Sequence, residues 1–422
     1  MLLNVISSAD APRILAAMRE RAAETNTEIT ATAENILREV RKNGFDAVKA
    51  CSLRFDHAEP YEIPTERVRA AYEAIPAVLR RALEHAAENV RAYHMQRVPE
   101  SWMWEKDEGR RLGQVLRGLD RVGIYVPGGT AAYPSSVLML AIPARCAGVR
   151  EIVMTTPPTE NLSDAVLAAA YIAGVDRVFA VGGVQAIAAL AYGAGFIPRV
   201  DKIVGPGNAY VAAAKRLVYG AVDIDMVAGP SEVLVLADDT ADARCVAADL
   251  LGQAEHDRLA SAILVTTSAR LAEDTACELE LQSACLERQS IATQSIANYG
   301  AAIVCVSMEE AVRFANDVAP EHLEIMTENP RAILPGIRNA GAVFLGAYTP
   351  EPLGDYLAGP SHVLPTSGSA RFFSPIGVDS FIKRMSVIEY SKEALAEDAS
   401  DITTVAYAEK LTAHAHAVEV RT

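Results

Sequence analysis

The sequence lacks the short motifs that usually mark a nucleotide site or a hydrolase. No G-x-G-x-x-G follows a predicted strand and no G-x-x-x-x-G-K-[ST] occurs, so the common dinucleotide fingerprint and the P-loop are both excluded. H-E-x-x-H and the G-x-S-x-G elbow are also absent. Any active site must therefore be assembled from residues that lie far apart in the chain.

Cysteines at paired spacing and basic runs are missing too, and we expect no leader. The six cysteines show no C-x-x-C spacing, which is typical of reduced thiols in a cytoplasmic protein. With 39 basic and 54 acidic residues the net charge is −15, so we expect no nucleic-acid partner. Asp10 and Arg13 interrupt the stretch that a signal peptide would need. Residues 178–198 carry no charge, but their alanines and glycines indicate a buried strand, a turn and a helix, not a membrane span.

The 422 residues are 50% hydrophobic and 22% charged, which indicates a globular protein of two or three domains. From about residue 120, β-branched runs alternate with Ala-rich segments of helix length, as in parallel sheets covered on both faces. Two sets of runs predict two doubly wound α/β sheets that meet near Gly229-Pro230, after a helical start and before a helical tail. The predicted strands are 122–126, 151–155, 177–181 and 202–205, then 232–238, 261–267, 301–306 and 341–346.

Four glycine-rich turns accompany these strands. Bare backbone at the carboxyl ends of parallel strands lets a ligand approach closely, and each turn is accompanied by a side chain that can form a hydrogen bond. One such turn is usually an ordinary connection, whereas four together favour a ligand cleft. The turns are 126–136, 181–186, 205–210 and 228–233, with Tyr125, Gln185, Asn208 and Ser231.

A metal site can be assembled from side chains of the C-terminal half. Gln253 and His256 are three residues apart on a predicted helix and project from one face, although such a pair is more often simply exposed. Asp355 lies in a Pro/Gly-rich loop that also carries His362, and His414 lies in the tail. Gln253, His256, Asp355 and His414 would give nitrogen and oxygen ligands that suit Zn²⁺, Mn²⁺ or Co²⁺.

Glu321 and His322 are adjacent after Pro320. Neighbouring side chains diverge on a helix or a strand, so we expect two separate roles, with His322 suited to general-base work. The alternative is the first turn of a helix with a favourably placed glutamate.

Taken in order, these segments resemble the histidinol dehydrogenase family over essentially the whole chain. The matching segments are RFD (54–56), YVPGGTAAYPSSVLM (125–139), VGGVQAIAALAYG (181–193), KIVGPGNAYV (202–211), GPSEVLVLAD (229–238), DLLGQAEHD (249–257), PEHLE (320–324), GDYLAGPSHVLPTSGSAR (354–371) and AEKLTAHA (408–415).

The resemblance implies a zinc-dependent, NAD-linked oxidation of L-histidinol through L-histidinal to L-histidine, the last step of histidine biosynthesis. It also implies an intertwined homodimer with shared active sites and one zinc per subunit; no membrane partner is expected, from the composition of 178–198. The fold would be α/β, with two incomplete Rossmann-like doubly wound domains and small helical terminal segments. We expect a helical segment over 1–24, an α/β domain with most metal and catalytic residues over 25–124 and 233–376, a Rossmann-like NAD-binding domain over 125–232 and a tail domain over 377–422.

The same resemblance assigns roles to individual residues. His322 would be the base of the first oxidation, and Glu321 would activate the water that adds to the aldehyde. The expected cofactor contacts are Tyr125, Gln185 and Asn208, and the expected zinc ligands are Gln253, His256, Asp355 and His414. The expected substrate contacts are Ser231, Gln253, His256, His322, Asp355, His362, Glu409 and His414.

Two positions depart from the family pattern. Lys410 stands where the family usually has glycine, and we expect an ordinary helical conformation there because a left-handed one would cost about 1 kcal/mol. Ser361 replaces the usual asparagine before His362. The runner-up function is a related zinc and NAD enzyme acting on another small amino or sulfonated alcohol. A zinc hydrolase would leave the dinucleotide contacts unexplained, and a non-catalytic metal protein would leave Glu321 and His322 unexplained.

Overall fold

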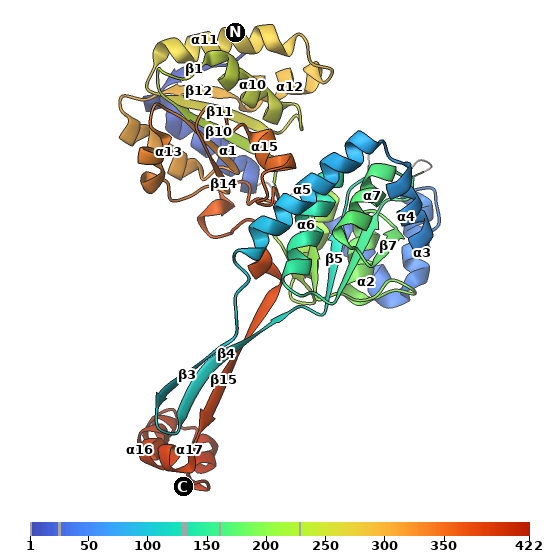
Figure 1. Cartoon of the computed structure of the whole chain (residues 1–422), viewed down its shortest axis with the longest axis vertical. Helices are drawn as coiled ribbons and strands as arrows, with labels where there is room; N and C mark the ends of the chain where they lie inside the picture. Colours follow the sequence, from blue (N-terminus) through green and yellow to red (C-terminus); the bar gives the residue numbers. More distant parts are fainter. Residues whose placement is uncertain (1, 24–26, 129–132, 160–161, 228) are drawn as a thin grey trace.

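A computed structural model describes residues 2–23, 27–128, 133–159, 162–227 and 229–422. They form two α/β lobes and a long arm that carries the C-terminus (Figure 1). Part of the glycine turn 126–136, namely 129–132, and Ala228 of the turn 228–233 lie outside the described residues.

Lobe 1 is built on a six-stranded sheet. Its strands are, in spatial order, β2 (Tyr61–Ile63), β7 (Arg177–Ala180), β6 (Glu151–Thr156), β5 (Arg121–Tyr125), β8 (Lys202–Val204) and β9 (Asp223–Ile224). All neighbours are parallel except β2 and β7. One face is covered by α4 (Thr65–Ala74), α5 (Ala77–Met95), α6 (Pro134–Cys146) and α7 (Asp164–Ala173), the other by α2 (Thr27–Asn43), α3 (Phe45–Phe55), α8 (Gly183–Tyr192) and α9 (Ala209–Val218).

Lobe 2 contains a second six-stranded sheet, in which every pair is parallel. Its strands are β1 (Val5–Ser7), β12 (Ala301–Val304), β11 (Ser261–Thr266), β10 (Glu232–Ala237), β13 (His322–Met326) and β14 (Ala342–Leu345). Its helices are α1 (Ala11–Ala23), α10 (Ala243–Ala254), α11 (Ala269–Ser283), α12 (Gln289–Tyr299), α13 (Met308–Val318), α14 (Pro330–Ile333) and α15 (Glu351–Tyr356).

Both sheets follow the same winding. In lobe 1 the chain runs from β5 outward through β6 and β7, then returns to the other side of β5 for β8 and β9. In lobe 2 it runs from β10 through β11 and β12, then returns for β13 and β14. This is the order of the first five strands of a doubly wound nucleotide-binding sheet, so the predicted fold class is confirmed.

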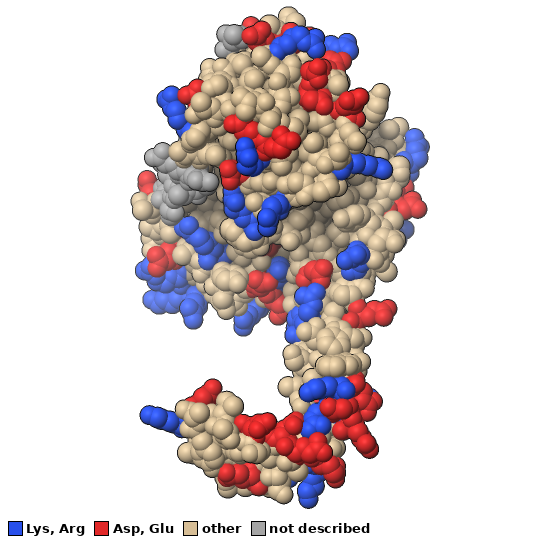
Figure 2. All heavy atoms as spheres, turned by 90° about the vertical axis from the view of Figure 1, so that its left-hand side faces the viewer, with Lys and Arg blue, Asp and Glu red and all other residues tan. Residues whose placement is uncertain are grey.

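The arm is an antiparallel ribbon capped by two helices. Its strands are β3 (Trp102–Asp107), β4 (Arg110–Gly118) and β15 (Ile382–Tyr390), with β4 in the middle, and its helices are α16 (Lys392–Ala408) and α17 (Thr412–Glu419). The Arg110 guanidinium holds α16 to the ribbon, because it donates hydrogen bonds to Asp398 at 2.9 and 3.0 Å and to Glu397 at 2.9 Å. Figure 2 shows acidic side chains gathered along this arm, which projects well beyond the lobes.

All eight predicted strands are present, and 178–198 folds as the expected strand, turn and helix. Among the described residues, no helix is both long and apolar enough to cross a bilayer. The helical start and tail were incompletely predicted: 1–24 also contributes β1 to lobe 2, the next hundred residues contribute β2, β3 and β4, and 377–422 begins with β15.

The grouping of 25–124 with 233–376 differs from the packing. Helices α2 and α3 contact α8 and α9, and α4 and α5 contact α6 and α7, so all four belong to lobe 1. Residues 125–232 supply α6 and α7 to one face of this sheet and α8 and α9 to the other. The helices of the N-terminal part complete that cover.

Candidate active site

The candidate catalytic residues meet at the amino ends of two neighbouring strands of lobe 2. Ser231 directly precedes β10, Glu321 directly precedes β13, and His322 is the first residue of β13, paired in register with Val233. This is the opposite edge from the carboxyl ends where we expected the turn 228–233 to present a ligand site. The helix alternative for Glu321 and His322 was wrong, because Glu321 directly precedes a buried strand and His322 begins it.

His322 is held in one orientation by the backbone of the next strand. Its Nδ1 lies 3.2 Å from the carbonyl oxygen of Glu232, to which it donates, so Nε2 carries the lone pair. Nε2 is buried with no hydrogen-bond partner among the described residues and lies 3.8 Å from Asp355 Oδ1. Burial lowers the pKa of His322 to about 4, so near pH 7 the ring is neutral and the lone pair of Nε2 is free.

Glu321 is a buried carboxyl beside this imidazole. Its Oε2 accepts a hydrogen bond from the backbone N–H of Glu232 at 3.0 Å and lies 3.9 Å from His322 Nδ1. Burial, with smaller contributions from the charges of Glu232, Asp355 and Glu351, raises its pKa well above the usual range. A carboxylate of raised pKa is a better proton acceptor when ionised.

The end of α10 brings the predicted Gln–His pair to the same place. Gln253 lies in the last turn of α10, while His256 lies just beyond the helix, where its N–H donates to the Gln253 carbonyl at 3.2 Å. Gln253 is 1% exposed, and its Oε1 finds no partner within the described part of the chain. A buried amide oxygen without a donor is costly, and a cation would satisfy it.

Helix α15 supplies two carboxylates to this cluster. Asp355 was predicted, whereas Glu351, four residues earlier on the same helical face, was missed. Ligand atoms of His256, Glu351 and Asp355 lie within 4.8 Å of one another, a spacing that could hold a metal ion. The acidic residues of PEPLGD, spaced at i and i+4, were the signal that could have identified Glu351.

Buried carboxyls fix α15 over the sheet. Glu324 Oε1 accepts the first N–H of the helix, that of Glu351, at 2.8 Å, and the Glu324 and Asp249 carboxyls hydrogen-bond to each other. Burial, followed by the Asp249 charge, raises the pKa of Glu324 to about 9. Glu324 is therefore protonated near pH 7 and can donate to Asp249 while it accepts from α15.

His362 lies beside Asp355 with both ring nitrogens engaged. Nδ1 donates to the Asp355 carbonyl at 2.9 Å, so Nε2 accepts from the Ser136 hydroxyl at 3.1 Å. A cavity of about 220 Å³ is lined by His322, Asp355 and His362. Ser361, the departure from the family pattern, donates to the Met139 carbonyl at 3.2 Å.

Two predicted site residues are not part of this cluster within one chain. Glu409 and His414 are exposed at the far end of the arm, on α16–α17 (Figure 1). The expected helical conformation of Lys410 between them was wrong, since its φ is +60°. The N–H groups of Lys410 and Leu411 donate to the carbonyls of Tyr407 and Ala406, and this Schellman pattern offsets the strain.

The predicted cofactor contacts lie at the carboxyl edge of the sheet of lobe 1. Tyr125 ends β5, and its buried hydroxyl accepts the N–H of Gly183 at 3.1 Å. Gln185 lies in the first turn of α8. Asn208 caps α9, because its Oδ1 accepts the N–H groups of Tyr210 and Val211 at 3.1 Å. This edge is where doubly wound sheets bind nucleotides.

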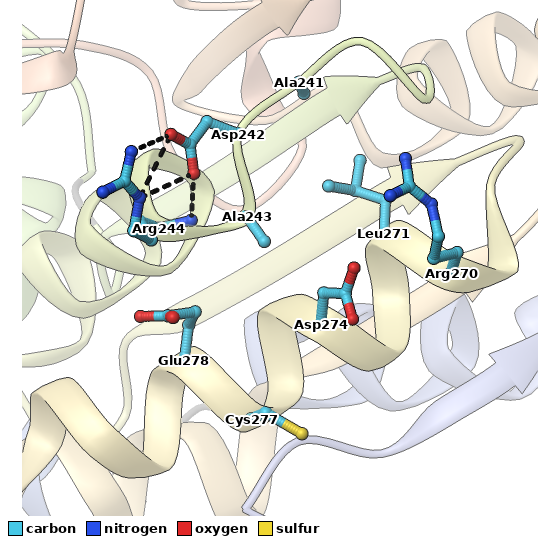
Figure 3. Close-up of a pocket in the computed structure, with 9 residues that line it drawn as sticks. All are labelled: Ala241, Asp242, Ala243, Arg244, Arg270, Leu271, Asp274, Cys277 and Glu278. Carbon is cyan, nitrogen blue, oxygen red and sulfur yellow. Dashed lines mark hydrogen bonds and ion pairs between the residues drawn. The ribbon is translucent and has the colours of Figure 1, made fainter.

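A second hollow lies between the starts of α10 and α11 (Figure 3). Its polar side chains include Asp242 and Arg244, which pair with each other at 2.6 Å, and Asp274 and Glu278 of α11. It is lined by none of the predicted site residues. We therefore assign it no part in the chemistry.

Comparison with known proteins covers the whole chain. A family model described as histidinol dehydrogenase matches residues 19–422. Histidinol dehydrogenases of Clostridium acetobutylicum and Caldanaerobacter subterraneus subsp. tengcongensis are 50% and 52% identical to it, covering 98% and 96% of this chain and 97% and 95% of those proteins. The crystal structure of histidinol dehydrogenase from Elizabethkingia anophelis matches with a TM-score of 0.94 at 36% identity, over 100% of this chain and 98% of that one.

This similarity extends over nearly the full length of the chain and of its relatives. The chain therefore belongs to the histidinol dehydrogenase family of NAD-dependent oxidoreductases and oxidises histidinol in the biosynthesis of histidine.

Proposed function

We propose that Gln253, His256 and Asp355 of one subunit and His414 of its partner bind a catalytic zinc ion. The support is twofold: the buried Oε1 of Gln253 has no hydrogen-bond partner among the described residues, and ligand atoms of His256, Glu351 and Asp355 lie within 4.8 Å of one another. Two imidazoles, an amide oxygen and a carboxylate form a donor set that suits Zn²⁺. When bound, the ion supplies a Lewis acid that orients the nitrogen groups of histidinol.

His322 then acts as the general base of the first oxidation. Its Nε2 takes the proton of the substrate hydroxyl. The Nδ1–H group continues to donate to the Glu232 carbonyl and so fixes the orientation of the ring. Because the pKa of His322 is lowered to about 4, the base is in its active form throughout the neutral range. A bound NAD would supply the acceptor for the hydride of the carbon that bears this hydroxyl.

Glu321 serves the second oxidation. Water must add to the aldehyde carbon to give the hydrate, and Glu321, whose pKa burial raises, takes a proton from that water. After releasing its first proton to solvent, which its lowered pKa favours, His322 removes a hydroxyl proton of the hydrate as the second hydride leaves the same carbon. Ser231 and the partner subunit's Glu409 complete the substrate contacts, and His362 supports Asp355 by donating to the Asp355 carbonyl. Tyr125, Gln185 and Asn208 form the NAD site of lobe 1, and two NAD are consumed per histidinol.

We place the protein in the cytoplasm, because its six cysteines, all within the described residues, are unpaired.

The site is completed by a second copy of the chain. The arm carries Glu409 and His414 away from its own cluster (Figure 1). All six residues of β3 are exposed, with Trp102 and Trp104 at 49% and 53%. An edge strand with exposed aromatic side chains is typical of a surface that another chain covers.

Mixing two inactive variants tests the shared site. His414→Asn and His256→Asn are combined under conditions that allow subunits to exchange, and NADH formation from L-histidinol is followed. In a heterodimer one site has all four ligands and the other has two lesions, so about a quarter of all sites should be active after random exchange. The control is the double variant His256→Asn/His414→Asn mixed with itself. No recovery, with exchange confirmed by mass spectrometry, would show that both ligands come from one chain.

A further inference from the structure

The segment 54–56 contributes to the family resemblance but has no role in the mechanism above. Asp56 follows the last residue of α3 and is partly buried against the turn between β7 and α8. Its Oδ2 accepts a hydrogen bond from Gln185 Nε2 at 3.0 Å, and its carboxylate also accepts the backbone N–H of Gly182. Asp56 therefore extends the carboxyl edge of lobe 1, where the dinucleotide site is proposed.

This is an unfavourable place for a carboxylate. The C-terminal end of a helix carries partial negative charge and favours a cation. The next residue, His57, has φ of +55°, a conformation that a side chain with a Cβ rarely adopts. Burial also raises the pKa of Asp56. Several costs at one position of a ligand-binding edge indicate a functional constraint.

The hydrogen bonds define what such a group can bind. An ionised carboxylate only accepts, and two of its acceptor positions are used by Gln185 and Gly182. A ligand that reaches the remaining positions must donate, as the hydroxyls of a ribose do, whereas a phosphate would be repelled. Gln185 is 1% exposed, so Asp56 is the more accessible of the two side chains.

We propose that Asp56 binds the adenosine ribose hydroxyls of NAD and selects NAD against its 2′-phosphorylated form. This inference rests on the proposed NAD site. The oxidised carbon must lie at His322 in lobe 2, so the nicotinamide half faces that lobe. Helix α3 packs on α8, on the side of lobe 1 away from α15 (Figure 1), which leaves the adenosine half for Asp56.

The test measures cofactor affinity directly. NAD⁺ and NADP⁺ are titrated calorimetrically into the zinc-loaded dimer of the wild type, Asp56→Asn and Asp46→Asn. Asp46 lies on the exposed face at the start of α3, so its variant removes the same charge from the same helix. We expect Asp56→Asn to bind NAD⁺ about tenfold more weakly, from the loss of a hydrogen bond to a charged group. Its NAD⁺/NADP⁺ preference should fall by at least as much, and Asp46→Asn should match the wild type.

An NAD⁺ analogue without adenosine ribose hydroxyls gives a second measurement that needs no folded variant. The wild type should bind the analogue about tenfold more weakly than NAD⁺. Equal binding of the analogue and NAD⁺ by the wild type, or an unchanged NAD⁺/NADP⁺ preference in Asp56→Asn, would overturn the assignment. Failure of the wild type to bind NAD⁺ at all would instead refute the proposed cofactor site.

Discussion

Burial of His94 should make the stability of lobe 1 depend on pH. This residue lies in the last turn of α5 with 5% of its surface exposed, and its Nε2 has no hydrogen-bond partner among the described residues. Burial lowers its pKa from 6.5 to about 4. The unfolded chain therefore binds a proton on this ring at a higher pH than the folded protein does.

The direction and the size of the effect follow from this difference. Between about pH 6.5 and pH 4 the unfolded state binds more protons, so the free energy of unfolding falls as the pH falls through that window. The whole shift corresponds to about 3 kcal/mol, and the part between pH 7 and pH 5 to about 2 kcal/mol. For a unit of about 200 residues, that loss lowers Tm by about 5 °C.

Thermal unfolding followed by circular dichroism at pH 7 and pH 5 measures this contribution. His94→Phe replaces the ring with one that cannot titrate, and His85→Gln, on the exposed face of α5, is the control. We expect the loss of Tm on acidification to be about 5 °C smaller in His94→Phe than in the wild type. His85→Gln should follow the wild type. Equal losses in all three proteins would refute the reasoning.

Four further outcomes follow from the contacts. Glu321→Gln should slow NADH formation from histidinal more than from histidinol, whereas equal loss in both assays would contradict its role in hydration. Glu324→Gln should lower Tm little, because the amide can still donate to Asp249 and accept from α15, but Glu324→Leu should lower stability by about 2 kcal/mol in thermal unfolding. Arg110→Met should release α16 and abolish turnover, with the circular dichroism of the lobes retained. Chelation should abolish activity reversibly with unchanged far-UV circular dichroism, since each lobe has its own core.

The fold could be predicted where the residues of a buried strand are also apolar. β10 is buried at all six positions, and its run EVLVLA is almost wholly apolar. β13 is equally buried, yet HLEIM begins with His322, the proposed general base, and contains Glu324, so its pattern was interpreted as a possible helix start. Where function requires ionisable groups in a buried strand, the hydrophobic pattern no longer predicts that strand.

The candidate site could be predicted in part. His256, Glu321, His322 and Asp355 were all identified from the sequence, and the structure brings them together. The predicted edge of the sheet was wrong. The order of residues in the sequence indicates the amino edge, because Ser231 and Glu321 precede their strands. Glu351 was missed because it becomes distinctive only when α15 lies beside His256.

The strands of the arm could not be predicted, because hydrophobic alternation reflects burial and these strands bury few of their residues within one chain. β3 and β15 expose most of their residues, so neither shows the alternation of a half-buried strand. Its internal order comes instead from the ladder between β4 and β15 and from Arg110. The proposed dimer would cover the aromatic side chains of β3 and bring His414 to the partner's Gln253. Dimer formation and completion of the zinc site would then be one event, so zinc should strengthen subunit association by the same factor by which association strengthens zinc binding.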